Sequence, residues 1–466
     1  MSFMVRDMSA ILFKLVLLLG CFLVLSASSQ DVGGDNSSGG REALEVGIEI
    51  GFGGPAIAPP PEECEGCHPP VPDCPPPPPP PPEPSCPPPP QQPPMPLISA
   101  SLRIAVPVIR RFQKTVTCDP KSTLSTWVGD SPMDVCDRKK YKGFFCEKPP
   151  GRNDLTIASI DFNGLGICSS STDILLDNFV DIALFHANSN NLTGTITPKI
   201  ANLPYLYELD LSNNKFSSQF PSVVLKIKML DFLDLRFNQL SGLVPRELFV
   251  RPLTVLFINN NQFLQKLPDN LGASPVTYLT LANNRFGGAI PRSIGNAKNT
   301  LREVLFLNNQ LSGCLPYEIG FLQKATVFDA GGNYLVGPIP ISFGCLKKVE
   351  QLNLARNMLT GEIPEVVCAL PSLLNLSLSD NYFTSVGPVC KKLIEKNVLD
   401  VRKNCIPGCP SQRSQQECSK FLCKPVNCPC PPTAPCNLPA LEQAVLASPP
   451  PLSVPLKASY SALHRP

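Results

Sequence analysis

The sequence predicts an α/β protein, a right-handed solenoid of stacked repeats with a parallel β-sheet on its concave face and disulfide-stapled caps at both ends. Three observations lead to this prediction. An asparagine-centred pattern recurs every 23 to 25 residues, apolar residues precede most of these asparagines at constant offsets, and cysteines cluster on both sides of the repeated region. One repeat of this length cannot bury its own apolar face, so neighbouring repeats must stack.

The repeat is centred on an asparagine that is followed two residues later by Leu or Phe. Apolar residues stand eight, five and three positions upstream, as in Leu206, Leu209 and Leu211 before Asn214. The sequence GEIP at 361–364 shows a second signature, a Gly and an apolar residue followed by Pro. This is the leucine-rich repeat, and the second signature resembles its plant extracellular form. The nine matching asparagines are Asn190, Asn214, Asn238, Asn261, Asn284, Asn309, Asn333, Asn357 and Asn381.

Each position of the repeat has a physical role. The leucines occupy alternate positions of a short strand, so they all point to one side of the sheet. The asparagine leaves the strand and turns inward, where its amide can bond backbone groups of its own and the neighbouring repeat. An earlier strand, Ile157 to Phe162, has the same spacing but carries Leu165 where the asparagine belongs. We interpret it as a tenth repeat that caps the array.

The chain begins with a segment typical of secretion. Arg6 and Lys14 precede an uncharged apolar run and then small residues, which is the order of a signal peptide over residues 1–29. Residues 30–58 are predicted to be disordered. Residues 59–98 are so rich in proline that we expect a polyproline II segment. No apolar run is long enough to span a bilayer, so we expect a secreted protein.

The boundaries of the folded part follow from where the repeat pattern starts and stops. Residues 99–154 contain a short amphipathic stretch and cysteines, and they are predicted to form an N-terminal cap. Residues 155–389 hold about ten leucine-rich repeats. Residues 390–424 are predicted to be a cysteine-rich C-terminal cap, and residues 425–466 a proline-rich disordered tail. Such caps are needed because the ends of a solenoid would otherwise expose its core.

The 20 cysteines of a secreted chain should mostly form disulfides. Removal of the signal peptide takes Cys21 and leaves an odd number, so one thiol should be free or should join a second copy in a disulfide-linked homodimer. Cys345 and Cys368 occupy nearly equivalent positions of successive repeats, within disulfide reach, and Cys368 with Cys390 is the competing pair. Both pairings stay open. The disulfide candidates are Cys136, Cys146, Cys345, Cys368, Cys390, Cys405 and Cys418.

Composition and motifs exclude several classes of function. The 40 Lys and Arg against 38 Asp and Glu give a net charge of only +2, which provides no field to hold nucleic acid. The three histidines are far apart in sequence, and no HExxH, GxSxG or phosphate-loop pattern is present. We therefore predict that the protein is not an enzyme and that it needs neither a cofactor nor a metal.

Strand positions that do not face the core line the concave surface, where two patches emerge. An acidic stripe adjoins an aromatic and apolar patch. Exposed apolar residues beside charges of one sign are typical of interaction surfaces, and negative charge steers a basic partner toward them. The predicted ligand-binding residues are Glu208, Asp210 and Asp234 of the acidic stripe, with Phe232, Phe257, Tyr278 and Leu305 of the apolar patch.

Three asparagines stand in N-x-Ser/Thr sequons, which are glycosylation candidates in a secreted chain. They are Asn36, Asn191 and Asn375. Asn375 falls on the concave side of the last repeat that the pattern identifies. A glycan there would restrict a partner to the earlier repeats.

Several segments resemble plant leucine-rich repeat extensins. The runs VLFLNNQLSGCLPYEIG at 304–320, VEQLNLARNMLTGEIP at 349–364 and NCIPGCPSQRSQQEC at 404–418 are similar to that family, and the resemblance covers about residues 99–428. It implies a protein secreted to the cell wall, whose repeat domain binds small basic cysteine-rich signalling peptides. The chain lacks a recognisable extensin repeat tail, because its C-terminal segment offers only Ser448 before three prolines.

The leading functional prediction is a secreted, cell-wall-associated binding protein. It captures a small basic cysteine-rich peptide on its repeats and contributes to wall signalling or organisation. Two alternatives stay open: an inhibitor of secreted wall-degrading enzymes that uses the same face on a protein ligand, and a mainly structural wall protein. The basic segment 391–424, with eight Lys or Arg against three acids, makes an acidic wall polysaccharide another candidate partner.

Overall fold

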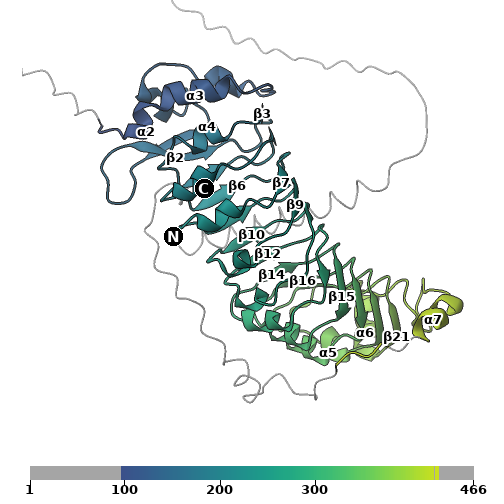
Figure 1. The fold of residues 1–466 in the computed structure, drawn as a ribbon. Helices are drawn as coiled ribbons and strands as arrows, with labels where there is room; N and C mark the ends of the chain where they lie inside the picture. The colour runs from purple at the N-terminus through teal and green to yellow at the C-terminus, as the bar shows by residue number, and fades with distance from the viewer. Residues whose placement is uncertain (1–95, 424–425, 430–466) are drawn as a thin grey trace, which may run out of the picture. The chain divides into compact units, whose positions relative to one another are not determined.

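The computed structural model describes residues 96–423 and 426–429, which coil into a curved array of repeats (Figure 1). One side of every coil contributes a strand to a 12-stranded sheet in the order β1-β2-β4-β6-β8-β10-β12-β14-β16-β18-β20-β22. β1 is antiparallel to β2, and the other pairs are parallel. The predicted leucine-rich repeat solenoid is confirmed.

The strands of the 12-stranded sheet are short because each repeat enters and leaves the sheet within a few residues. Most consist of one inward apolar residue between two residues of the open face, as in Leu209 between Glu208 and Asp210. The strands are β1 (Phe144–Glu147), β2 (Thr156–Asp161), β4 (Leu184–His186), β6 (Glu208–Asp210), β8 (Phe232–Asp234), β10 (Val255–Phe257), β12 (Tyr278–Thr280), β14 (Glu303–Leu305), β16 (Val327–Asp329), β18 (Gln351–Asn353), β20 (Asn375–Ser377) and β22 (Leu399–Asp400).

A second side of the coil carries smaller parallel sheets, one of two, one of three and one of five strands. Most of these strands follow directly after the repeat asparagine. They are β3 (Cys168–Ser169) with β5 (Asn191–Leu192), then β7 (Ser217–Gln219), β9 (Gln239–Gly242) and β11 (Gln262–Phe263), and then β13 (Gly287–Gly288), β15 (Gln310–Cys314), β17 (Tyr334–Gly337), β19 (Met358–Ile363) and β21 (Tyr382–Val386).

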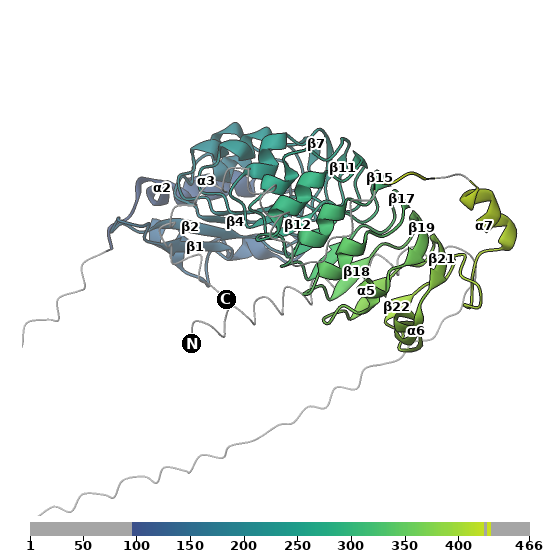
Figure 2. The same cartoon turned by 90° about the horizontal axis from the view of Figure 1, so that it is seen from below.

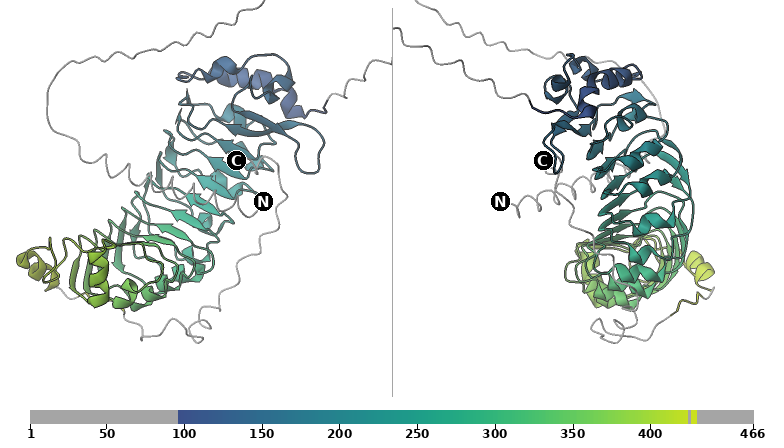
Figure 3. Two further views of the ribbon diagram at one scale, coloured as in Figure 1. Left: turned by 180° about the vertical axis from the view of Figure 1, so that it is seen from behind. Right: turned by 60° about the vertical axis from the view of Figure 1, so that its left-hand side comes forward.

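The third side is made mainly of 3-10 turns, which most often start directly after the proline of the repeat. Strands stack about 4.8 Å apart, whereas a helical turn with its side chains is wider, so the repeats are wedge-shaped and the array curves (Figure 3). The elements are α4 (Asp173–Leu176), η3 (Pro198–Asn202), η4 (Ser222–Lys226), η5 (Arg246–Val250), η6 (Leu271–Ala273), η7 (Arg292–Ala297), η8 (Tyr317–Phe321), η9 (Ile341–Cys345) and α5 (Glu365–Cys368).

The repeat asparagines form the hydrogen-bonded ladder that the sequence predicts. The Asn309 amide nitrogen donates to the carbonyls of Leu281, Phe306 and Leu307 at 3.0–3.2 Å, and its oxygen accepts from the backbone of Phe286 at 3.0 Å. Each asparagine thereby satisfies backbone groups of two neighbouring turns, most of which are buried.

The ladder extends one step beyond the predicted repeats. Asn404 is fully buried, donates to the carbonyls of Leu378 and Val401, and accepts from the backbone of Phe383. Its strand is β22, inside the segment that the sequence assigned to the C-terminal cap. The pattern of Leu399, Val401, Asn404 and Ile406 repeats the motif and could have identified this coil.

The N-terminal end is covered by α2 (Ala100–Arg103), α3 (Ala105–Gln113) and the short turns η1 (Thr123–Thr126) and η2 (Pro132–Cys136). Trp127 lies at the centre of an aromatic cluster, with ring centroids 5.4 Å from Phe144 and 5.8 Å from Phe162. Disulfides join Cys118 to Cys168 and Cys136 to Cys146. The first of these was not anticipated from the sequence.

The C-terminal end is covered by α6 (Pro388–Glu395) and α7 (Gln415–Leu422), which lies at the far end of the array in Figure 2. Cys368 pairs with Cys390 and Cys405 with Cys418. Of the two pairings left open, the structure therefore has Cys368 with Cys390, and Cys345 is disulfide-bonded elsewhere. Cys409 and Cys423 are free thiols. The disulfide-linked homodimer stays a prediction.

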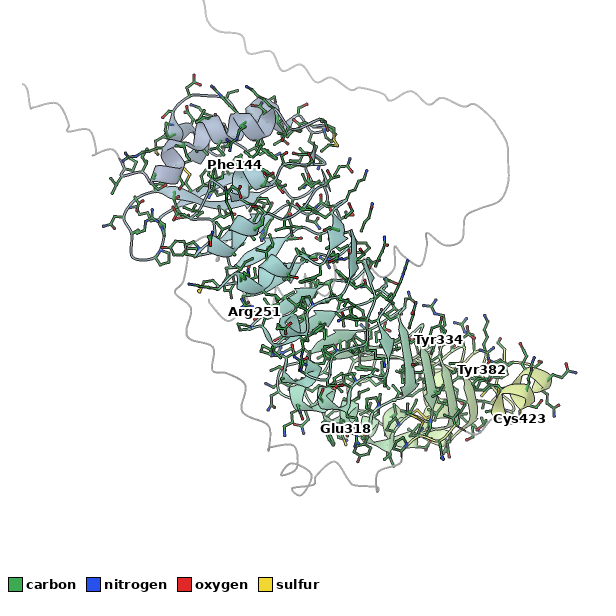
Figure 4. All side chains as sticks on the ribbon, viewed as in Figure 1. Phe144, Arg251, Glu318, Tyr334, Tyr382 and Cys423 are labelled. Carbon is green, nitrogen blue, oxygen red and sulfur yellow. A yellow bond between two sulfur atoms is a disulfide. The ribbon has the colours of Figure 1, made fainter. Side chains whose placement is uncertain are left out.

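Residues 426–429 return to the repeats, which differs from the disordered tail predicted from residue 425 onward. A disulfide joins Cys428 to Cys314 of β15, across 114 residues. Gly337 of β17 makes room for this contact: its φ is +78°, and a β-carbon there would collide with the Cys428 sulfur. Tyr334, the first residue of the same strand β17, is labelled in Figure 4.

Several predictions fall outside the described residues: the signal peptide, the 30–58 segment, most of the polyproline stretch, Asn36 and most of the tail. Within 96–423 and 426–429, no helix is long and apolar enough to cross a membrane.

Candidate functional site

The structure brings the seven predicted ligand-binding residues together on five adjacent strands, β6, β8, β10, β12 and β14. Glu208 pairs in register with Phe232, and Asp210 with Asp234. The row of in-register residues that starts with Asp210 and Asp234 continues across the next strands. It passes through Phe257 and Thr280 to Leu305. Neighbouring strands lie about 4.8 Å apart, so the seven positions form one continuous surface. We call this surface the sheet face.

The acidic part of the sheet face is built on β4 and β6. The Glu208 carboxylate accepts a hydrogen bond from Nε2 of the His186 ring at 2.8 Å, and both side chains are partly exposed. Burial alone would lower the pKa of His186, but the bond to Glu208 and its charge outweigh burial and leave the pKa raised. Asp210 accepts from the backbone and hydroxyl of Ser212, so its carboxylate is held at the surface of the sheet.

Asp234 and Phe257 are less accessible than the sequence predicts, with 0% and 2% of their surfaces exposed. Arg236 accounts for part of this burial. Its guanidinium nitrogen Nε lies 2.9 Å from the Asp234 carboxylate, and the group sits 5.1 Å from the centre of the Phe257 ring. Strand alternation identifies the face a residue occupies, but it does not show that a long side chain from the following turn folds back across its neighbours.

Burial raises the pKa of Asp234 to about 8, and repulsion from Asp210 acts in the same direction, against the attraction of Arg236. Although Arg236 is close, carboxylate oxygen Oδ2 has no well-aligned hydrogen bond, so the pair compensates the buried charge incompletely. Glu208 and Asp210 therefore supply the accessible negative charge of the stripe. Asp234 contributes a charge that depends on pH.

The apolar part of the sheet face is Phe232, Tyr278 and Leu305, which are all half-buried. The Phe232 ring packs edge-on against Phe257 with centroids 6.2 Å apart. Because strands hold these rings in fixed positions, a ligand would lose little entropy in ordering them.

The acidic character of the face continues at Asp329 of β16. Burial raises the pKa of Asp329 to about 6, while hydrogen bonds from Gly331 and Asn353 oppose the shift. Two residues that the sequence analysis left out of the site thus matter for its charge: Arg236 and Asp329. Asp329 could have been found from the repeat, because it occupies the same offset as Asp210, whereas the path of the Arg236 side chain could not.

The two sequons within the described residues differ in accessibility. Asn375 is exposed on β20, three strands beyond the sheet face, and its oxygen accepts from Ser377 at 3.0 Å. Asn191 is half-buried on β5, and its amide nitrogen lies 3.0 Å from the sulfur of Cys168. Glycosylation of either residue stays a prediction.

Within the part of the chain that the structure describes, no three His, Cys, Asp or Glu side chains converge in a group that could hold a metal ion. The polar groups of the sheet face are spread along successive strands. Such an arrangement suits contacts with an extended or folded partner.

Comparison with known proteins agrees with the repeat architecture. The family model for the Leucine Rich Repeat matches residues 205–226, 276–297 and 348–370. Leucine-rich repeat extensin-like protein 6 of Arabidopsis thaliana is 40% identical over 358 residues, which cover 72% of this chain and 69% of that protein. The chain belongs to the leucine-rich repeat extensin-like family.

A second relative from the leucine-rich repeat extensin-like family matches a similar share of the chain. Leucine-rich repeat extensin-like protein 7 of Arabidopsis thaliana is 40% identical over 353 residues, covering 74% of this chain and 79% of that protein. Among solved structures, a plant ice-binding protein superposes with a TM-score of 0.52 at 20% identity, covering 66% of this chain and 96% of that one. This last likeness shows the fold alone.

Proposed function

We propose that this extensin-like protein is a secreted, cell-wall-associated binding protein that captures a small basic cysteine-rich peptide on its sheet face. The observation that carries the proposal is that Glu208 and Asp210 on β6 share one sheet face with Phe232 on the adjacent β8 and Tyr278 on β12, two strands farther along. The carboxylates attract and orient a cationic ligand, and the half-buried rings provide apolar area for it to cover.

The chemistry of the sheet face favours binding over catalysis. Its ionisable groups are held by neighbours in ways that fix their position: Asp210 by Ser212, Glu208 by His186 and Asp234 by Arg236. A peptide lysine or arginine that reaches Glu208 would compete with His186 for the carboxylate. Binding should therefore be strongest when His186 is neutral.

The proposal is tested by removing the accessible negative charge. The wild-type chain is immobilised, exposed to the secreted fraction of plant tissue, and the retained peptides are identified by mass spectrometry. The affinity of a retained basic peptide is then measured for the double variant E208Q/D210N. We expect at least about a tenfold loss at low salt, and a smaller loss at high salt because exposed charges are screened.

A matched control removes the same charge elsewhere. Glu247 in η5 and Asp269 before η6 are both exposed and belong to the side of the coil with the 3-10 turns. The variant E247Q/D269N should leave the affinity within about twofold of wild type. Equal losses in the two double variants would show that net charge, and not the sheet face, attracts the peptide.

A further inference from the structure

Phe237 differs from every residue at the equivalent position of the other repeats. This position precedes the ladder asparagine and lies in the left-handed backbone region, with φ between 51° and 62°. Asn and Gly tolerate that region, whereas a bulky apolar residue there is an outlier. The residues in this row are Ser189, Asn213, Phe237, Asn260, Asn283, Asn308, Gly332, Arg356, Asp380 and Lys403.

Phe237 also interrupts a ladder of side-chain hydrogen bonds along the row. Asn213 donates to Ser189 at 2.9 Å, on one side of Phe237. On the other side, Asn283 donates to Asn260 at 3.1 Å and Asn308 donates to Asn283 at 2.8 Å. A phenyl ring has no group that could link Asn213 to Asn260. The fold therefore loses local polar contacts by having Phe at this position.

Packing covers only part of this ring, because 38% of Phe237 stays exposed. Its chain neighbour Arg236 is the residue that contacts both Asp234 and Phe257. Phe237 is thus attached to the border of the sheet face, three residues after the end of β8. Residues held in a backbone conformation that their type seldom adopts are commonly found at functional sites.

We propose that Phe237 is a ligand-contacting residue of the sheet face, against which an apolar side chain of the basic peptide packs. The inference rests on the proposed function and adds a specificity element to it: the ligand carries an apolar residue next to its cationic ones. An exposed aromatic ring loses few rotamers on binding and buries a large area, as interface anchors commonly do.

The test uses two short synthetic basic peptides that differ only in a central Leu or Gly, and the full chain with F237N. Asn suits the left-handed backbone and can rejoin the ladder. We expect F237N to raise the unfolding midpoint by about 1–3 °C, while its affinity for the Leu peptide falls about tenfold. Its affinity for the Gly peptide should stay within about twofold of wild type.

The matched control is Y334N, which removes another aromatic side chain, 55% exposed, from β17 outside the sheet face (Figure 4). It should leave both affinities unchanged. Unchanged Leu-peptide affinity in F237N, or a lowered midpoint, would overturn the role of Phe237 while leaving the sheet face as the binding surface. Failure of the wild-type chain to bind either peptide would overturn the proposed function and this inference with it.

Discussion

Single residues explain much of how this chain folds, and the ladder asparagines are the clearest case. Each one carries a donor and an acceptor at fixed geometry, which matches the carbonyls and the N–H that the tight turn leaves unpaired. Glutamine would be too long, and aspartate would offer no donor. This chemistry is why the asparagine spacing alone predicted the coil.

Replacing Asn309 with Ala should lower the free energy of unfolding by about 2–4 kcal/mol, because several buried backbone groups lose their partners. The neighbouring exposed residue, Gln310, provides the control. The variant Q310A should change the free energy of unfolding by less than about 0.5 kcal/mol. Chemical denaturation of the two variants measures both values. Equal stabilities would mean that the ladder contributes nothing beyond shape.

The E208Q variant should lower the pKa of His186, because the carboxylate raises it. The ion pair of His186 with Glu208 stabilises the fold fully below the unfolded pKa of His, about 6.5. This stabilisation is lost as the pH rises through the raised pKa of His186 in the folded protein. Nuclear magnetic resonance titration of the imidazole checks the shift. A His186 pKa that is the same in both chains would contradict this account.

At the scale of elements, the sequence predicted which segments form strands because alternation and the asparagine spacing are local signals. It placed the end of the array one coil early, although Leu399, Val401 and Asn404 carry the same motif. Two disulfides, Cys118 with Cys168 and Cys314 with Cys428, were missed because they join segments that are distant along the chain. Contacts of that kind depend on the completed fold.

The disulfide between Cys314 and Cys428 should hold residues 426–429 against the repeats. The variant C428S should lower the free energy of unfolding by about 2–4 kcal/mol and open the 426–429 segment to proteases. The free thiol Cys423 offers a control, since C423S breaks no disulfide. Identical cleavage patterns in wild type and C428S would show that other contacts hold this segment.

At the scale of the whole molecule, stacking turns a local pattern into an extended face. The sequence correctly predicted which residues share that face, because strand register is fixed by the repeat length. It did not predict the burial of Asp234 and Phe257, because the path of the Arg236 side chain depends on its surroundings in three dimensions. The sequence places Phe237 directly before a ladder asparagine. Only the structure shows that its backbone is left-handed, which is what makes this residue unusual.

The sheet face and its neighbouring ionisable residues become more negative as the pH rises. Raising the pH from 5 to 8 deprotonates Asp329, with its pKa of about 6, and begins to ionise Asp234, with its pKa of about 8. It also moves His186, whose pKa is raised, toward its neutral form. All three changes make the face more negative. The affinity for a basic peptide should therefore rise by about three- to tenfold across this range, measured at constant low salt. A falling affinity would contradict the assignment of the face.

The central claim is that the sheet face binds a basic peptide, and hydroxyl-radical footprinting of side chains tests it most directly. With the retained peptide bound to the wild-type chain, labelling of Phe232, Phe237 and Tyr278 should fall, while labelling of Tyr334 on the second side of the coil stays constant. Protection of Tyr334 with unchanged labelling of Phe232 and Tyr278 would contradict the account.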